Sequence, residues 1–81
     1  MENLNMLSQL GVGESCRVVS LDVSGSQRRR MLDLGLVQGT KVVTVQKSPS
    51  GDPKAYSIRG AVVALRDEDA DKIIIRKITA S

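Results

Sequence analysis

The alternation of apolar and polar residues along the chain predicts a protein built mainly of short β-strands. Successive side chains of a strand point to opposite faces, so a period of two marks a half-buried strand. This pattern predicts five strands, at residues 15–22, 40–47, 54–59, 61–66 and 72–78. The third and fourth strands are separated only by Arg59-Gly60, which predicts a tight hairpin that the glycine permits. The last strand has Ile73, Ile74 and Ile75 in a row, which is typical of a strand buried on both faces.

Three stretches have the spacing or the start signal of a helix. Leu4, Leu7 and Leu10 are three residues apart, as they would be on one face of a short helix. A second helix is predicted at residues 25–34, between the first two strands. Asp67 is placed to cap a single helical turn, whose acidic residues would be stabilised at the helix start.

The helix at residues 25–34 has signals for both of its ends. Ser24 or Ser26 can cap the start, and with Ser24 as the N-cap, Gln27 occupies the position of a capping-box partner. Gly35 is placed to adopt the left-handed conformation just past the last turn, which glycine adopts without strain. The helix is therefore expected to stop sharply at Gly35.

Five short strands with brief connections favour a small barrel, because curling removes the exposed edges of the sheet and encloses one core. Leu36 is expected to fold back onto Met31, and Gly39 to make the turn into the next strand. The helix would then cover one end of the barrel with Met31, Leu32 and Leu34. The residues expected to support the architecture are Met31, Leu32, Gly35, Leu36, Gly39, Gly60, Ile73 and Ile75.

Composition is consistent with a small, aliphatic β-rich domain. The 81 residues make one domain, residues 1–81, and their apolar part includes ten Val and five Ile, with no Phe, no Trp and one Tyr. Cys16 is the single cysteine, so no disulfide can form within the chain. The N-terminus lacks the basic start of a signal peptide, and no apolar run approaches the roughly 18 residues of a membrane span. We therefore expect a cytoplasmic protein with no direct membrane insertion.

Charged residues give the candidates for contact with a partner. The net charge is +3, with Arg28, Arg29 and Arg30 contiguous and an acidic cluster at residues 67–71. The arginines are either a docking surface for an acidic partner or a solvated helix face. Asp52, at the tip of a Gly-Asp-Pro turn, is a second candidate for partner contact.

Catalytic and metal sites are not expected. The chain has no His, and Cys16 on an apolar strand face is most simply a core residue. The acidic cluster lacks the ligand spacing of a calcium loop, and helix-start electrostatics explain it. No nucleophile is paired with a base and no phosphate-binding loop is present, so we expect neither an enzyme nor a cofactor. One aromatic ring cannot form a stacking platform for nucleic acid or a groove for proline-rich peptides.

An ordered set of short motifs along the whole chain resembles the ferrous iron transport protein A family, the FeoA-type domain. The motifs are L-S-Q-L-G-V-G-E at residues 7–14, R-R-M-L-D-L-G-L at 29–36, G-D-P at 51–53, I-R-G at 58–60, A-L-R at 64–66 and the ending at 70–75. One departure is Gln38, where the family commonly has a proline.

The resemblance implies a single SH3-like domain that acts as a non-catalytic accessory of a membrane ferrous iron transporter, by binding its cytoplasmic GTP-binding domain. The resemblance also implies a role in iron transport and the family-level label of transition metal ion binding, although the residues offer no metal site. The alternative is a small basic barrel that binds nucleic acid, or a regulatory module related to the C-terminal domain of iron-dependent repressors.

Overall fold

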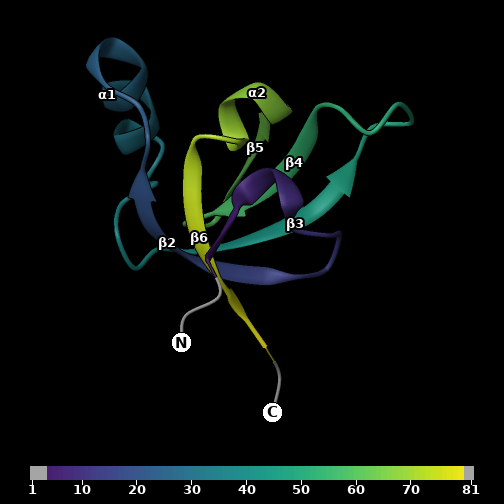
Figure 1. The fold of residues 1–81 in the computed structure, drawn as a ribbon. Helices are drawn as coiled ribbons and strands as arrows, with labels where there is room; N and C mark the ends of the chain where they lie inside the picture. The colour runs from purple at the N-terminus through teal and green to yellow at the C-terminus, as the bar shows by residue number, and fades with distance from the viewer. Residues whose placement is uncertain (1–3, 80–81) are drawn as a thin grey trace.

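The computed structural model describes residues 4–79, which form a strongly curved antiparallel sheet with two short α-helices and one 3-10 turn (Figure 1). In chain order the elements are β1 (Leu4–Met6), η1 (Leu7–Gln9), β2 (Ser15–Leu21), α1 (Gly25–Asp33), β3 (Lys41–Lys47), β4 (Lys54–Ile58), β5 (Ala61–Leu65), α2 (Asp67–Ala70) and β6 (Ile73–Ile78). The predicted class, mostly β with a helix between strands, is confirmed.

The sheet has the order β1-β6-β2-β3-β4-β5, and every neighbouring pair is antiparallel. Register shifts interrupt β2 between Val18 and Ser20 and β3 between Thr44 and Gln46. Such irregularities bend a strand and increase its twist, which lets the sheet wrap around one core. The expectation that curling removes the edges is wrong for the described residues, because β1 and β5 are left as edge strands.

The N-terminal segment differs from the predicted helix. Residues 4–6 form β1, which pairs with β6 and places Leu4 opposite Arg76 and Met6 opposite Ile74. Only the following three residues form a helical turn, of the 3-10 type, and the leucine spacing of three suits such a turn as well as an α-helix. Leu7 and Leu10 are buried, whereas Leu4 is 48% exposed. Hydrogen bonding to the free side of β6 therefore outweighs the local helical spacing.

The core is aliphatic apart from one ring. Cys16 is buried as predicted, and Tyr56, the single aromatic residue, is fully buried among the aliphatic side chains. The buried apolar residues are Leu7, Leu10, Cys16, Val18, Met31, Leu36, Val42, Tyr56, Ile58, Leu65, Ala70, Ile73 and Ile75. Ile74 is only half-buried, so β6 is not covered equally on its two faces.

Helix α1 ends as its sequence predicts. Gly35 has φ +97°, its N–H donates to the carbonyl of Leu32, and the N–H of Leu36 donates to the carbonyl of Met31. These two bonds form a Schellman motif, with Met31 and Leu36 as its buried apolar pair. The stop is thus built from hydrogen bonds and packing together.

The predicted helix starts are partly wrong. Ser24 is the N-cap of α1 by position, but its side chain makes no capping hydrogen bond, and Gln27 does not complete a capping box. The N-cap of α2 is Arg66, so Asp67 is the first residue inside the helix. At the start of α2 an acceptor from another segment takes the place of the cap, and the Gln27 side chain bonds α2 instead of its own helix.

Candidate functional site

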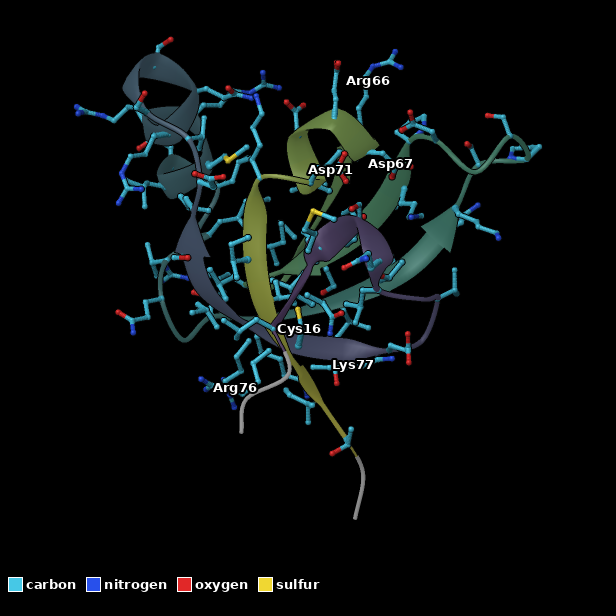
Figure 2. The ribbon with its side chains drawn as sticks, in the orientation of Figure 1. Cys16, Arg66, Asp67, Asp71, Arg76 and Lys77 are labelled. Carbon is cyan, nitrogen blue, oxygen red and sulfur yellow. The ribbon has the colours of Figure 1, made fainter. Side chains whose placement is uncertain are left out.

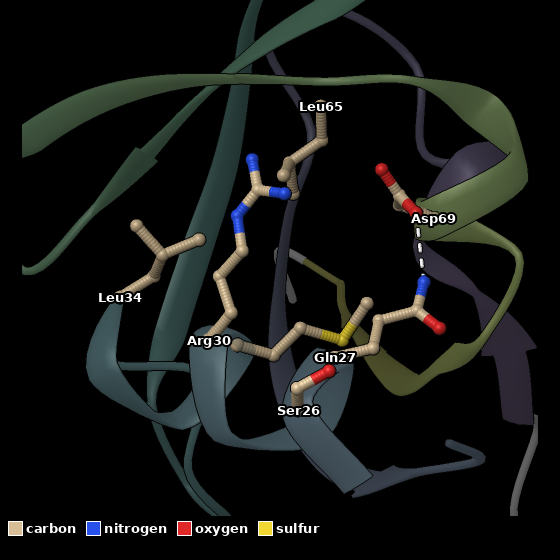
Figure 3. Close-up of a pocket in the computed structure, with 7 residues that line it drawn as sticks. Ser26, Gln27, Arg30, Leu34, Leu65 and Asp69 are labelled. Carbon is tan, nitrogen blue, oxygen red and sulfur yellow. Dashed lines mark hydrogen bonds between the residues drawn. The ribbon is translucent and has the colours of Figure 1, made fainter. Parts of the chain in front are cut away.

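A groove separates α1 from α2 and the end of β5 (Figure 3). Its volume is about 360 Å³. The residues that line it are Ser26, Gln27, Arg30, Met31, Leu34, Leu65 and Asp69. We refer to it as the α1–α2 groove.

The α1–α2 groove combines an apolar floor with a polar rim. Met31 and Leu65 are almost fully buried and Leu34 is half-buried, so aliphatic groups form the floor. Figure 3 shows Arg30 extending from α1 across the groove toward Leu65. An apolar centre with charged groups at its edge is the usual composition of a protein-docking surface.

A single side-chain hydrogen bond crosses the α1–α2 groove at its polar end. The amide Nε2 of Gln27 donates to Oδ1 of Asp69 over 2.9 Å, which joins the first turn of α1 to α2 (Figure 3). This contact directs the Gln27 side chain toward α2, whereas a capping-box glutamine turns back so that its side-chain oxygen accepts the N–H of its N-cap residue.

The C-terminal end of α1 is fixed against the hairpin between β4 and β5. A methyl group at Gly35 would lie 2.5 Å from Cδ of Arg59 and 3.2 Å from its Cγ, so the arginine stem lies directly on the glycine. Gly35 therefore serves twice, as the left-handed residue of the helix stop and as the flat surface beneath Arg59. This close approach joins the C-terminal end of α1 to the β4–β5 hairpin.

The three contiguous arginines do not form one surface. Consecutive helical residues point about 100° apart, and the side chains accordingly separate. Arg28 donates to the carbonyl of Leu21 over 3.4 Å, Arg30 lines the α1–α2 groove, and Arg29 is exposed away from it. No ion pair joins Arg29 to Asp33 within the described residues.

Asp52 has a structural contact that the sequence did not indicate. Its Oδ1 accepts the backbone N–H of Asp67 over 3.0 Å, so the turn at residues 51–53 satisfies the start of α2. This is the external partner that replaces the expected capping by Asp67 itself. Asp52 remains exposed, as a partner contact would require.

Beneath α2, a polar network joins segments that are distant in the sequence. Nζ of Lys54 donates to the carbonyl of Ser8 over 2.6 Å and lies 3.4 Å from Oδ1 of Asp67. The hydroxyl of Ser8 also hydrogen-bonds Asp71, so both ends of α2 are tied to η1 and β4. Figure 2 shows Asp67, the first residue of α2, and Asp71, which follows the helix, near each other.

The hydroxyl of Tyr56 is buried beside this network without a protein hydrogen-bond partner in the described residues. Burial, with a smaller contribution from the charge of Asp67, raises the pKa of Tyr56 far above its usual value. Burial also raises the pKa of Cys16 to about 11. Both groups are therefore neutral at physiological pH, and Cys16 lacks the thiolate that nucleophilic or metal-binding cysteines require.

Within residues 4–79, no three Cys, Asp or Glu side chains are grouped so that they could hold a metal ion. Helices long and apolar enough to span a bilayer are also absent from this range.

The residues expected to support the architecture lie in and around the core. Met31, Leu36, Ile73 and Ile75 are buried, Leu32 is half-buried, and Gly35, Gly39 and Gly60 have positive φ angles. Sequence reasoning missed Gln27, Leu65 and Asp69 as parts of the α1–α2 groove, and Arg59 as the side chain that lies on Gly35, because these contacts depend on how distant segments pack.

Comparison with known proteins assigns the family. The family model of the FeoA domain matches residues 5–77. A curated relative from Porphyromonas gingivalis, the Fe(2+) transport protein A/Fe(2+) transporter FeoB fusion protein, is 37% identical over 75 residues. The match covers 93% of this chain and 9% of the relative, so the chain spans about a tenth of that protein's length.

Solved structures agree with the family model. The FeoA protein from Chlorobium tepidum superposes with a TM-score of 0.87 and 31% identity, covering 95% of this chain and 73% of the other. FeoA from Stenotrophomonas maltophilia, in complex with zinc, gives a TM-score of 0.78 and 31% identity, with 88% of each chain covered. The latter is described as a procaryotic SH3 domain protein, in agreement with the SH3-like fold expected from the sequence. With these matches along its length, the chain belongs to the FeoA domain family.

Proposed function

We propose that this chain is a non-catalytic accessory protein of ferrous iron transport that binds the cytoplasmic GTP-binding domain of the membrane transporter. The observation that carries the proposal is the similarity to the fusion protein, whose name joins transport protein A and the transporter in one polypeptide. Fusion holds two domains at a high effective concentration, commonly in the millimolar range for short linkers, which favours direct contact between them. A separate chain of the same family would make that contact by diffusion.

The α1–α2 groove is the surface that we assign to this contact. Its aliphatic floor would bury apolar side chains of the transporter, and Arg30 on its rim would meet an acidic residue. Arginine is enriched among the residues that contribute most to protein interfaces, because its planar guanidinium binds carboxylates through two hydrogen bonds. The groove thus supplies both burial and orientation.

The experiment measures binding of the chain to the full-length transporter in nanodiscs, with no nucleotide, with GDP and with a non-hydrolysable GTP analogue. Arg30→Glu is expected to lower the affinity at least about tenfold, equivalent to 1.4 kcal/mol. Arg29→Glu makes the same charge change on the same helix outside the groove, and it is expected to lower the affinity less than about threefold.

Absence of binding under all three nucleotide conditions would refute direct contact with the transporter. Equal effects of Arg29→Glu and Arg30→Glu would refute the α1–α2 groove as the docking surface, because net charge alone would then explain the loss. Melting temperatures of both variants within a few degrees of the parent protein would establish that the fold is retained.

A further inference from the structure

Four cationic side chains form a continuous row across the outer face of the sheet. Arg17 on β2 is directly opposite Arg76 on β6 and Lys41 on β3. Val42 is opposite Ile58 in the antiparallel pair of β3 and β4. One residue further along, Lys41 is therefore opposite Arg59, which lies in the turn after β4. We call Arg17, Lys41, Arg59 and Arg76 the cation row.

The cation row lies on the outer surface, since its neighbours along each strand point inward. Cys16, Val42, Ile58 and Ile75 are buried, whereas all four members of the row are exposed. Figure 2 shows Arg76 on the side of the molecule opposite the acidic residues of α2. Arg76, a member of the cation row, therefore lies away from the acidic residues of α2.

The fold does not account for this arrangement. Like charges directly opposite on neighbouring strands are destabilising. No carboxylate pairs with Arg17, Lys41 or Arg59 in the part of the chain that the structure describes. The guanidinium of Arg17 donates to the carbonyl of Gly39 over 3.0 Å, which fixes the side chain and leaves its charge uncompensated. The repulsion within the row lowers the stability of the fold, and Arg17 is nevertheless held in position. An anionic ligand best explains this arrangement.

The surface beside the cation row is shaped for a ligand. Arg17, Lys41 and Arg59 line a shallow hollow of about 510 Å³ together with residues 37–40. A second row of side chains lies beside the cation row on the same face, two residues along each strand, and carries aliphatic and hydroxyl groups. Two of its members are clearly exposed, Val62 at 68% and Ile78 at 39%. Its members, in register across the strands, are Ile78, Ser15, Val43, Ser57 and Val62.

We propose that the cation row binds an extended acidic segment of a partner protein, with its acidic residues at alternate positions. Strands lie about 4.8 Å apart, so three intervals give the row a length of about 14 Å. An extended chain places alternate side chains about 6.6 Å apart, so three such carboxylates span about 13 Å and match the row. The intervening side chains would be near the aliphatic row, in contact with Val43 and Ser57.

Two other anions fit this surface less well. A flat bilayer surface would not enter the hollow between Lys41 and Arg59. A single-stranded nucleic acid gains much of its affinity from stacking on exposed aromatic rings, and Tyr56 is fully buried. Both remain outcomes of the test.

The test uses the complete chain and a fluorescent peptide of alternating Glu and Ser with four Glu residues, measured by anisotropy at about 0.15 M salt, where exposed charges beyond about 8 Å are screened. The chain is expected to bind this peptide and to ignore its Gln–Ser counterpart. Lys41→Glu is expected to lower the affinity at least tenfold, and Arg29→Glu, the same charge change on α1, less than twofold. Amide NMR shifts are expected at Arg17, Gly39 and Lys41.

Equal losses for Lys41→Glu and Arg29→Glu would overturn the proposal, since binding would then follow net charge. Tighter binding to phosphatidylserine vesicles, or to a single-stranded RNA of equal charge, would overturn the choice of an acidic polypeptide. If Lys41→Glu fails to fold, Lys41→Gln is expected to fold and to lower the affinity at least threefold; unchanged affinity there would overturn the proposal. No transporter is present in this assay, so its outcome is independent of the proposed function.

Discussion

Replacement of Gly35 by alanine tests how tightly the end of α1 is held against the hairpin. Two costs add at this position. An L-residue at φ +97° is strained by about 1–2 kcal/mol. The new methyl group would also lie 2.5 Å from Cδ of Arg59, and overpacking of this kind costs about 1–3 kcal/mol. The free energy of unfolding is therefore expected to fall by about 2–5 kcal/mol.

Gly39 provides a matched control. Its φ of +90° is similar, but an added methyl group would have no atom within 4 Å. Gly39→Ala should therefore lower the free energy of unfolding only by the cost of the backbone strain, about 1–2 kcal/mol. In an Arg59→Ala background the steric part disappears, so Gly35→Ala should then cost about as much as Gly39→Ala.

Urea unfolding followed by far-UV circular dichroism measures all four proteins and the double variant. The decisive quantity is the coupling between Gly35→Ala and Arg59→Ala, expected to be at least about 1 kcal/mol. If Gly35→Ala costs no more than Gly39→Ala, or if its excess persists without the Arg59 stem, the close approach does not fix the helix end.

Four further predictions concern the core, the pH dependence, α2 and the cation row. Tyr56→Phe removes a buried hydroxyl without a protein partner among the described residues, so thermal unfolding should show unchanged or higher stability, by up to about 1 kcal/mol; a loss above that value would reveal an unrecognised partner. Because the pKa of Cys16 rises to about 11 in the folded state, the native protein keeps a proton that the unfolded chain releases, and stability should fall as pH rises from about 9 to about 11, by up to about 2 kcal/mol. Cys16→Ala should lose that part of the urea-measured decline, and an unchanged decline would contradict the assignment. Asp52→Ala removes the acceptor for the N–H of Asp67 and should lower stability by about 1 kcal/mol, with faster amide exchange confined to α2 and its neighbours; exchange unaltered there would argue against the contact. Lys41→Thr relieves like-charge repulsion and introduces a β-branched residue, so it should raise stability by a few tenths to about 1 kcal/mol, and a lower melting temperature would contradict the cost assigned to the row.

Local signals in the sequence were sufficient for much of the architecture. The Gly35 stop and the Arg59-Gly60 hairpin each depend on interactions within a few residues, and the structure has both. The failures have one cause. The strand at residues 4–6 exists because β6 offers a free edge, and the start of α2 is satisfied by Asp52, fifteen residues away. Neither partner is local.

The candidate surfaces also depend on how the chain folds, and adjacency in the sequence does not reveal them. The sequence drew attention to Arg28, Arg29 and Arg30 because they are adjacent, and helical geometry then separates them. The cation row was invisible because its members come from four segments, and only the strand register brings them together. Each of them is one position away from a buried residue of its strand, so the correct register would have revealed the row.

Arg59 links the cation row to α1, because its charge belongs to the row and its stem lies on Gly35 at the end of the helix. A ligand that draws the Arg59 guanidinium outward would loosen the support of α1, and an occupant of the α1–α2 groove that shifts α1 would reposition the guanidinium. Thermodynamic linkage makes such an effect reciprocal, so the factor by which one ligand changes the affinity of the other is the same in both directions. A single side chain would thus couple the two proposed binding events in this small domain.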